Sequence, residues 1–382
     1  MEKNVAVLDI GSGKLVFAVG RKTGKGIYIV DNYACRRVPV YCQGQWIDVE
    51  TLALDLEQVV AKSGYNGKIR TVYVGVPSEF VKLESSAPIL KFDRERLITD
   101  EVIDEIQTQG DCFSDRGGYR TISSAARGYT LDERTRTLYP VGERARVLRA
   151  DMTYVLCRKD FCEPAAKLLA RFGFDTVKFI SQSWAQGSQL LDSDLRESGC
   201  CVADVGFLST SFFRVKGDGL EYLTTAPLGC GCIADDLSVA LDISIESALA
   251  FLPRINLARE LRDGDMYEVA DGTNVYRYDA GEVNALVQDR LRQLAGFFER
   301  CIRESRAKDA PAGNERIFLT GGGIPLIRGA VGSIETHLGR QVIVLVADVP
   351  RYDRAADTSF TALLNVASEI KASKSFWNKL FG

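Results

Sequence analysis

Short apolar runs that end at glycine turns organise the beginning of the chain. Residues Val5 to Ile10 are apolar except for Asp9, and the run stops at Gly11-Ser12-Gly13. Such a run predicts a buried strand that ends in a turn. The pattern that follows predicts two strands, a helix and another strand, in this order: Leu15 to Val19, Gly26 to Val30, Val49 to Lys62 and Thr71 to Val76. We therefore predict a β-β-β-α-β unit at the start of the chain.

The same order of apolar runs recurs later. Cys200 to Asp204 is an apolar run that closes on Gly206, about 195 residues after the first copy. Two strands, a helix start and a last strand are predicted to follow: Ser209 to Val215, Leu220 to Ala226, Leu228-Gly229-Cys230-Gly231 and Arg316 to Thr320. The last strand leads into Gly321-Gly322-Gly323, and a helix is predicted to begin at Pro325. Two such copies predict two similar halves that face each other across a cleft.

Two segments interrupt this plan. Residues 80–163 combine strand patterns with one predicted helix, Thr99 to Gln109. Residues 232–307 are mostly helical and contain a long amphipathic stretch from Glu282 to Glu304. Within this second segment, Asp263 to Asp279 is polar and is predicted to be a loop or a hairpin. The pattern as a whole predicts an α/β protein with two inserted subdomains.

Composition and charge exclude several classes of function. The chain has 382 residues, of which 46% are hydrophobic, and this is typical of a soluble globular protein of two or three domains. Its net charge of −3 argues against general nucleic-acid binding, because there is no basic excess to neutralise phosphates. His337 is the only histidine and has no nucleophile motif beside it, so we exclude Ser-His-Asp and Cys-His hydrolases.

The ten cysteines bear on the cellular compartment of the protein rather than on a metal site. The N-terminus runs directly into a strand, so we expect no signal peptide, and no apolar run is long enough to cross a bilayer. A reducing, cytoplasmic compartment follows, in which a disulfide framework is not expected. The pairs Cys200-Cys201 and Cys230-x-Cys232 do not have the spacing of zinc motifs, and we interpret them as buried small residues.

Three glycine turns at strand ends carry the candidate chemistry. Asp9 to Lys14 places a carboxylate before a turn rich in backbone N–H groups, which can hold phosphates while the carboxylate holds the waters of a bound Mg²⁺. An ordinary hairpin turn would need the same residues, so this motif alone does not distinguish a phosphate-binding turn from a hairpin. Asp204 with Gly206 supplies a second carboxylate and turn, and Gly321 to Gly323 would let a flat purine ring approach the backbone. Their order resembles the nucleotide-binding superfamily of actin, sugar kinases and chaperones.

The chain resembles one family of actin-like proteins in particular, the bacterial cell-division protein FtsA. Val7 to Lys14 is similar to the first phosphate motif of this family, and Val72 to Pro77 to the strand that leads into its inserted subdomain. Tyr139-Pro140-Val141-Gly142 resembles the Asn-Pro-Val-Gly turn near the end of that subdomain. Leu319 to Gly323 is similar to the adenosine motif. The resemblance covers nearly the whole chain.

This resemblance implies the fold and the domain organisation. It implies duplicated actin-like (ribonuclease H-like) domains around a nucleotide cleft, with an inserted α+β subdomain of the FtsA type. The implied parts are subdomain 1A (1–79 and 164–197), 1C (80–163), 2A (198–231 and 308–370), 2B (232–307) and a C-terminal tail (371–382). It also implies ATP and Mg²⁺ as ligands, with Asp9 and Asp204 on the metal side. Nucleotide contacts are then expected from Asp9, Gly11, Ser12, Gly13, Lys14, Asp204, Gly206, Gly321, Gly322 and Gly323.

The chain also departs from the FtsA pattern. The second phosphate motif of the family runs Asp-x-Gly-Gly-Gly-Thr-Thr-Asp, and here Phe207 and Leu208 replace two of its glycines while Ser211 replaces the last acid. Leu249 and Leu252 stand where the family carries Glu and Lys for the ribose, in a register that a shift of one residue would alter. Gln182 matches the position of the residue that orients water, and is the candidate for a weak catalytic role. We expect weak or absent nucleotide binding and little or no hydrolysis, which leaves open whether the chain is an enzyme.

The last twelve residues have the pattern of a helix that lies on a membrane. On a helix, one face would collect the apolar side chains and lysines would flank it, without an acid in the segment. The residues are Lys374, Phe376, Trp377, Lys379, Leu380 and Phe381. A terminal helix that docks on its own domain would show the same face. The FtsA resemblance favours the membrane, because members of that family end in such a tail.

These observations predict a structural adaptor rather than an efficient enzyme. In the leading hypothesis, an actin-like protomer polymerises and tethers the tubulin-like protein FtsZ to the anionic inner face of the cell membrane. Its FtsZ site would lie in residues 232–307. Two alternatives remain: an actin homologue of the PilM type, which serves pilus assembly, and an active actin-like ATPase.

Overall fold

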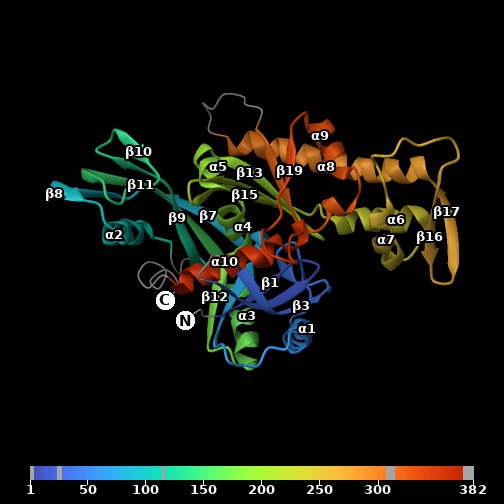
Figure 1. Cartoon of the computed structure of the whole chain (residues 1–382), viewed down its shortest axis with the longest axis horizontal. Helices are drawn as coiled ribbons and strands as arrows, with labels where there is room; N and C mark the ends of the chain where they lie inside the picture. The colour runs from blue at the N-terminus through green and yellow to red at the C-terminus, as the bar shows by residue number, and fades with distance from the viewer. Residues whose placement is uncertain (1–3, 24–27, 114–116, 307–314, 373–382) are drawn as a thin grey trace.

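Two lobes with the same strand order form the centre of the molecule, and one further subdomain extends from each (Figure 1). The computed structural model describes residues 4–23, 28–113, 117–306 and 315–372. In Figure 1 the first lobe lies at the bottom, the second lobe at the top, the insert at the left and the helical subdomain at the right. The sequence prediction of two similar halves is confirmed.

The first lobe is built on a five-stranded sheet in the order β12-β6-β1-β2-β3. β1 runs antiparallel to β2 and parallel to β6, and every residue of β1 is buried. The strands are β1 (Val5–Ile10), β2 (Leu15–Lys22), β3 (Tyr28–Arg36), β6 (Thr71–Val76) and β12 (Thr176–Ser181). The helices that follow them are α1 (Val49–Lys62), α3 (Lys159–Arg171), α4 (Gln182–Leu190) and α5 (Ser193–Ser198), and a small hairpin of β4 (Tyr41–Cys42) and β5 (Gln45–Trp46) precedes α1.

Local sequence explains where α1 begins and which face it buries. The side chain of Asp48 accepts a hydrogen bond from the backbone N–H of Glu50 at 2.9 Å, which caps the first turn. Leu52, Leu56 and Val59 recur at helical spacing and are all buried against the first lobe. The predicted bounds of this helix are those observed.

The second lobe repeats the plan with the sheet order β15-β14-β13-β18-β19. β13 is antiparallel to β14 and parallel to β18, as β1 is to β2 and β6. The elements are β13 (Cys200–Val205), β14 (Thr210–Lys216), β15 (Gly219–Ala226), β18 (Ile317–Thr320), α9 (Ala330–Leu338) and β19 (Val342–Val344). Equivalent carboxylates, Asp9 and Asp204, therefore stand near the ends of equivalent strands.

The insert occupies the chain between β6 and β12. Its long strand β11 pairs along one side with β9, and along the other side with β8 in its first half and β7 in its second half. The elements are η1 (Ser78–Phe80), β7 (Val81–Ser86), β8 (Ile89–Leu97), α2 (Asp100–Gly110), β9 (Tyr119–Leu131), β10 (Thr135–Thr137) and β11 (Arg144–Arg158). Ile106, Leu148 and Met152 belong to a core of its own, so the insert is a separate packing unit.

The helical subdomain contains α6 (Cys230–Leu241), α7 (Ile245–Phe251), η2 (Leu252–Arg254) and α8 (Ala280–Ser305). Asp279 caps α8 by accepting hydrogen bonds from the N–H groups of Gly281 and Glu282, at 2.8 and 3.0 Å. The segment Asp263 to Asp279, for which a loop or a hairpin was open, forms the hairpin of β16 (Met266–Asp271) and β17 (Asn274–Asp279).

Two expectations about the end of the chain were wrong. The helix expected from Pro325 begins only at Ala330, because the 3₁₀ turn η3 (Ile324–Leu326) and Gly329, at φ +81°, come first. The last helix, α10 (Thr358–Ala372), was included in subdomain 2A, but it packs on α4, β1 and β2 of the first lobe. Phe360, Leu363 and Leu364 are buried in the core of the first lobe. This burial of apolar side chains explains why the end of the chain packs on the first lobe rather than on the second.

None of the helices in the described ranges is long and apolar enough to cross a membrane. The tail residues expected to lie on a membrane, Lys374 to Phe381, fall outside the described residues.

Candidate functional site

The candidate site lies where the glycine turns of the two lobes meet, which we call the lobe junction. On the first side, Asp9 is 2% exposed and accepts hydrogen bonds from Gln182 Nε2 at 2.6 Å and from Ser359 Oγ at 2.7 Å. The turn after it closes through a hydrogen bond from the Gly11 N–H to the Lys14 carbonyl, at 2.9 Å. Gln182 also donates to the Ile10 carbonyl at 2.9 Å. The predicted catalytic glutamine is thus placed directly on the first carboxylate.

The second side repeats this turn with different side chains. The Gly206 N–H donates to the Ser209 carbonyl at 2.9 Å, as Gly11 does to Lys14. Gln186 Nε2 donates to Asp204 Oδ2 at 2.8 Å. Each carboxylate is therefore held by one glutamine of α4, and both glutamines come from the first lobe.

Burial governs the protonation of both carboxyl groups. It raises the pKa of Asp9 above the ordinary 3.8, against the Lys14 ammonium and the hydrogen bonds from Ser359 and Gln182, which lower it. Burial also raises the pKa of Asp204; the Gln186 hydrogen bond lowers it, and the neighbouring Asp9 raises it further. The charge of Asp9 therefore reaches Asp204 across the lobe junction and favours the neutral form of the Asp204 carboxyl group.

The third turn closes the junction from the second lobe. Gly321 has φ +95°, and a Cβ at this position would lie 2.3 Å from the Val205 carbonyl oxygen and 2.5 Å from Asp204 Oδ1. Only glycine fits such a close approach at positive φ. At Gly323 a Cβ would meet Cys230 Cβ at 2.7 Å. The structure therefore brings all three predicted turns together.

The residues of the junction do not fit a terminal phosphate in this arrangement. A Cβ on Gly13 would lie 2.5 Å from three atoms of Phe207, so the Phe207 side chain fills the space between the first and second turns. Lys14 Nζ donates to the Ala356 carbonyl at 2.5 Å instead of facing open space. Within the described residues, no three His, Cys, Asp or Glu side chains lie close enough together to hold a metal ion.

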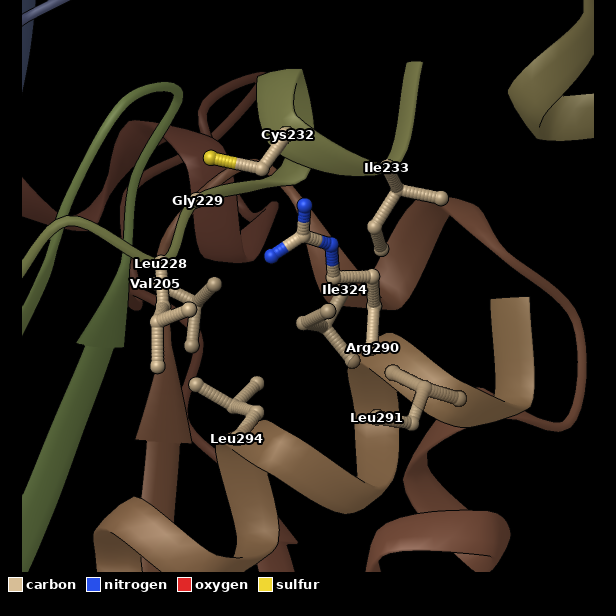
Figure 2. Close-up of a pocket in the computed structure, with 9 residues that line it drawn as sticks. All are labelled: Val205, Leu228, Gly229, Cys232, Ile233, Arg290, Leu291, Leu294 and Ile324. Atoms are coloured by element: carbon tan, nitrogen blue, oxygen red, sulfur yellow. The ribbon is translucent and has the colours of Figure 1, made fainter. Parts of the chain in front are cut away.

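The positions matched to the ribose also lack polar groups. Leu252 is 4% exposed in the core that the second lobe shares with the helical subdomain, and the partly buried Leu249 packs against that core. A recess does lie nearby, between the start of α6, α8 and the end of β13, and Figure 2 shows Arg290 beside Cys232 in it. Its volume of about 10 Å³ holds about one water molecule. Arg290 pairs there with Asp236, at 2.7 Å between Nη2 and Oδ1.

Sequence reasoning missed several residues of the junction. Gln186 lies four residues after Gln182, and that spacing on a helix could have indicated it. Ser359 is 350 residues from its partner Asp9 in the sequence, and no local sequence pattern predicts a contact over such a separation. Tyr41 is also buried there; burial raises its pKa well above 10.0, and the Glu79, Asp204 and Asp9 carboxylates raise it further.

Comparison with known proteins shows similarity to FtsA in sequence and to actin-like proteins in fold. No family model matches it. It is 22% identical to FtsA of Pseudomonas aeruginosa over 333 residues, which is 84% of this chain and 78% of the relative. It is 20% identical to FtsA of Neisseria meningitidis over 336 residues, 86% of this chain and 80% of the relative.

Solved structures give the same fold at lower identity. A chain of the PilM–PilN type IV pilus biogenesis complex superposes with a TM-score of 0.65 at 14% identity, covering 95% of this chain and 98% of that one. MreB5 of Spiroplasma citri bound to AMPPNP gives 0.54 at 11% identity, with 96% and 95% covered. The MamK double helical filament gives 0.55 at 14% identity, with 97% and 99% covered.

The duplicated lobes and their facing glycine turns define an actin-like protein. Because FtsA sequences match across most of its length, the chain is FtsA-like in sequence and actin-like in fold.

Proposed function

We propose that this protein is a cytoskeletal adaptor of bacterial cell division that polymerises and tethers an FtsZ-type filament to the cytoplasmic face of the cell membrane. The observation that carries the proposal is the similarity to FtsA over 84% of the chain. The likeness to a filament-forming actin homologue supports self-assembly. We assign the FtsZ contact to the helical subdomain, which extends away from both lobes (Figure 1).

The tail supplies the membrane contact in this proposal. Burial of Phe376, Trp377, Leu380 and Phe381 in a bilayer interface would contribute roughly 6–10 kcal/mol before ordering costs. Lys374 and Lys379 would each add about 1 kcal/mol near an anionic leaflet. Ordering a short helix removes much of this gain, so a single tail binds weakly. A filament that presents many tails would bind strongly through avidity.

The second part of the proposal is that ATP and Mg²⁺ are bound weakly or not at all, with little or no hydrolysis. Phe207 packed on Gly13 and Lys14 bonded to Ala356 support it, because both use groups that a nucleotide would need. The Gln182 side chain, held by Asp9 and Ile10, is not free to orient a water. An efficient ATPase is therefore the less favoured alternative.

Co-sedimentation with anionic phosphatidylglycerol vesicles tests the tether. We expect the full chain to pellet with vesicles and to carry FtsZ polymers with it, and a chain that ends at Ala372 to remain in the supernatant. Trp377→Glu should abolish pelleting, whereas Leu54→Glu, at an exposed position of α1 in the first lobe, should leave it unchanged. Equal behaviour of the full and shortened chains would contradict the membrane role.

An assembly adaptor of the PilM type is the second candidate, favoured by the TM-score of 0.65 over nearly the whole of both chains. Such an adaptor would bind a peptide of a membrane protein and would need no lipid-binding tail. In the same assay it would leave FtsZ polymers in solution. Recruitment of FtsZ to the vesicles therefore separates the two candidates.

A further inference from the structure

The lobe junction contains an aromatic side chain in the place where nucleotide-binding relatives need glycine. Phe207 lies between Gly13 of the first lobe and Gly231 at the start of α6. A Cβ on Gly13 would lie 2.5 Å from Cβ, Cγ and Cδ1 of Phe207, and one on Gly231 would lie 3.0 and 3.1 Å from Cε2 and Cζ. Any residue larger than glycine on the Gly13 side would displace the ring.

The backbone holds Phe207 firmly on the second lobe. Its carbonyl accepts a hydrogen bond from the Gly231 N–H at 2.8 Å, and the Cys230 N–H donates to the Gly206 carbonyl at 3.1 Å. The first residues of α6 thus hold the turn that contains Phe207 in place through two backbone hydrogen bonds. Close approach requires glycine here as well, because a Cβ on Gly229 would lie 2.0 Å from the Phe207 oxygen.

The turn of the first lobe that contacts Phe207, at Ser12 and Gly13, is also held in place by hydrogen bonds. The Gly13 and Ser12 carbonyls accept hydrogen bonds from the N–H groups of Val38 and Val40, at 3.2 and 3.0 Å. Ser12 Oγ in turn accepts from the Leu208 N–H at 3.1 Å, and this bond runs directly between the two turns. Two rigid surfaces therefore meet through the Phe207 ring and one hydrogen bond.

The lobes also touch elsewhere: Gln186 bonds to Asp204, and Val202 and Phe213 of the second lobe belong to the same apolar core as the first lobe. One more contact involves the insert. The turn between β14 and β15 reaches the insert, where the Asp218 N–H donates to the Ala126 carbonyl of β9 at 3.1 Å. Gly217, at φ +57°, approaches so closely that a Cβ would lie 2.8 Å from the Arg127 carbonyl oxygen. Because Ile122 and Val155 of the insert also pack in the core of the first lobe, this contact opposes separation of the lobes as well.

We propose that Phe207 is a built-in clamp, which joins the two lobes where a nucleotide would otherwise bridge them. The contact between the two lobes then does not depend on ATP. The inference rests on the proposed function, in which nucleotide binding is weak. It adds that the second turn excludes the terminal phosphate by a side chain of the protein, and that the lobes are held together without a ligand.

Thermal unfolding with nucleotide tests the exclusion. We expect ATP or AMPPNP with Mg²⁺ to leave the Tm of the full chain unchanged. The double variant Phe207→Gly, Leu208→Gly restores the glycines of the FtsA pattern, and its Tm should rise by about 3 °C or more with AMPPNP·Mg²⁺. A rise in the unaltered chain, or no rise in the variant, would overturn the exclusion.

Hydrogen exchange tests the clamp. In Phe207→Ala, amide exchange should increase at least tenfold both in residues 11–14 and in residues 206–210, because each turn loses its partner. Phe297→Ala, a buried aromatic of the helical subdomain, is the control: it should lower the Tm without faster exchange in residues 11–14. Unchanged exchange in Phe207→Ala would refute the clamp. These readouts do not involve vesicles or FtsZ, so the clamp can fail while the tether stands, and the reverse.

Discussion

The turn after Asp9 and the turn after Asp204 share a backbone plan and differ in what their side chains do. Each follows a buried strand, and each closes through a 2.9 Å hydrogen bond from its glycine N–H to the carbonyl three residues on. The first turn carries Ser12 and Gly13 and leaves a flat backbone surface. The second carries Phe207 and Leu208 and covers that surface. The two turns therefore have the same backbone geometry, but the side chains of the second turn cover the surface that the first turn leaves open.

This difference shows that a turn is specified by fewer residues than a binding site. The strand ends and the first glycine fix the backbone, since the same closing bond forms with large or small side chains between. A phosphate site additionally needs open backbone N–H groups over the whole turn. In the first turn Ser12 and Gly13 have side chains small enough for such an approach, whereas Phe207 and Leu208 of the second turn do not.

The largest effect is expected where the two turns touch. Gly13→Ala would place a Cβ 2.5 Å from Phe207 atoms that include its Cβ, which cannot move without the backbone, and should reduce the free energy of unfolding by about 2–3 kcal/mol. Gly11→Ala is the matched control: its nearest contact is the Lys14 carbonyl oxygen at 3.3 Å, so the cost should stay below about 1 kcal/mol. Urea unfolding of both variants measures the difference.

A double variant decides whether Phe207 causes that cost. In the Phe207→Gly background the obstructing atoms are gone, and Gly13→Ala should cost less than about 0.5 kcal/mol. If Gly13→Ala remains as costly without Phe207, the two turns are not in contact in the way that the structure describes.

The two carboxyl groups give the next largest effect, and it depends on pH. Because burial raises the folded-state pKa of Asp9 above 3.8, the folded chain binds more protons than the unfolded chain between these two pKa values. The stability that Asp9 contributes therefore falls as pH rises through this window, by up to about 1.4 kcal/mol per pH unit. In Asp9→Asn this dependence should vanish. Urea unfolding of both proteins from pH 4 to 8 measures it as the difference between the two curves.

The same measurement with Asp204→Asn compares the two lobes. Since Asp9 helps to raise the pKa of Asp204, the double variant should lose less pH dependence than the sum of the single variants. A difference curve that is flat, or that rises with pH, would contradict the burial of these groups as acids.

Periodicity predicted the lobes well and the junction only in part. The strands around Asp9 and Asp204 could be read from local apolar runs, and the helix at Val49–Lys62 from its spacing, because burial on one face leaves a local pattern. The packing of α10 on the first lobe has no such signature, since an apolar helix face does not specify which sheet covers it. The presence of Phe207 and Leu208 in place of two glycines was visible in the sequence as a departure from the FtsA motif. Its actual partner, Gly13, lies 194 residues away and became visible only in three dimensions.

The smallest effect concerns charge, which only the first turn carries. Lys14 Nζ donates to the Ala356 carbonyl at 2.5 Å, and Lys14→Met keeps most of the side-chain bulk while it removes this bond. The free energy of unfolding should fall by about 1 kcal/mol. Lys22→Met is the control: it removes a 3.6 Å ion pair with Glu369 and a contact with the Tyr28 ring, both partly exposed, and should cost only about 0.5 kcal/mol. The Lys14 ammonium also lowers the pKa of Asp9, so its removal should extend the window of falling stability to higher pH. If Lys14→Met changes the stability but leaves that window in place, Lys14 acts on the junction through its hydrogen bond alone, and the charge of the first turn has no part in holding the lobes.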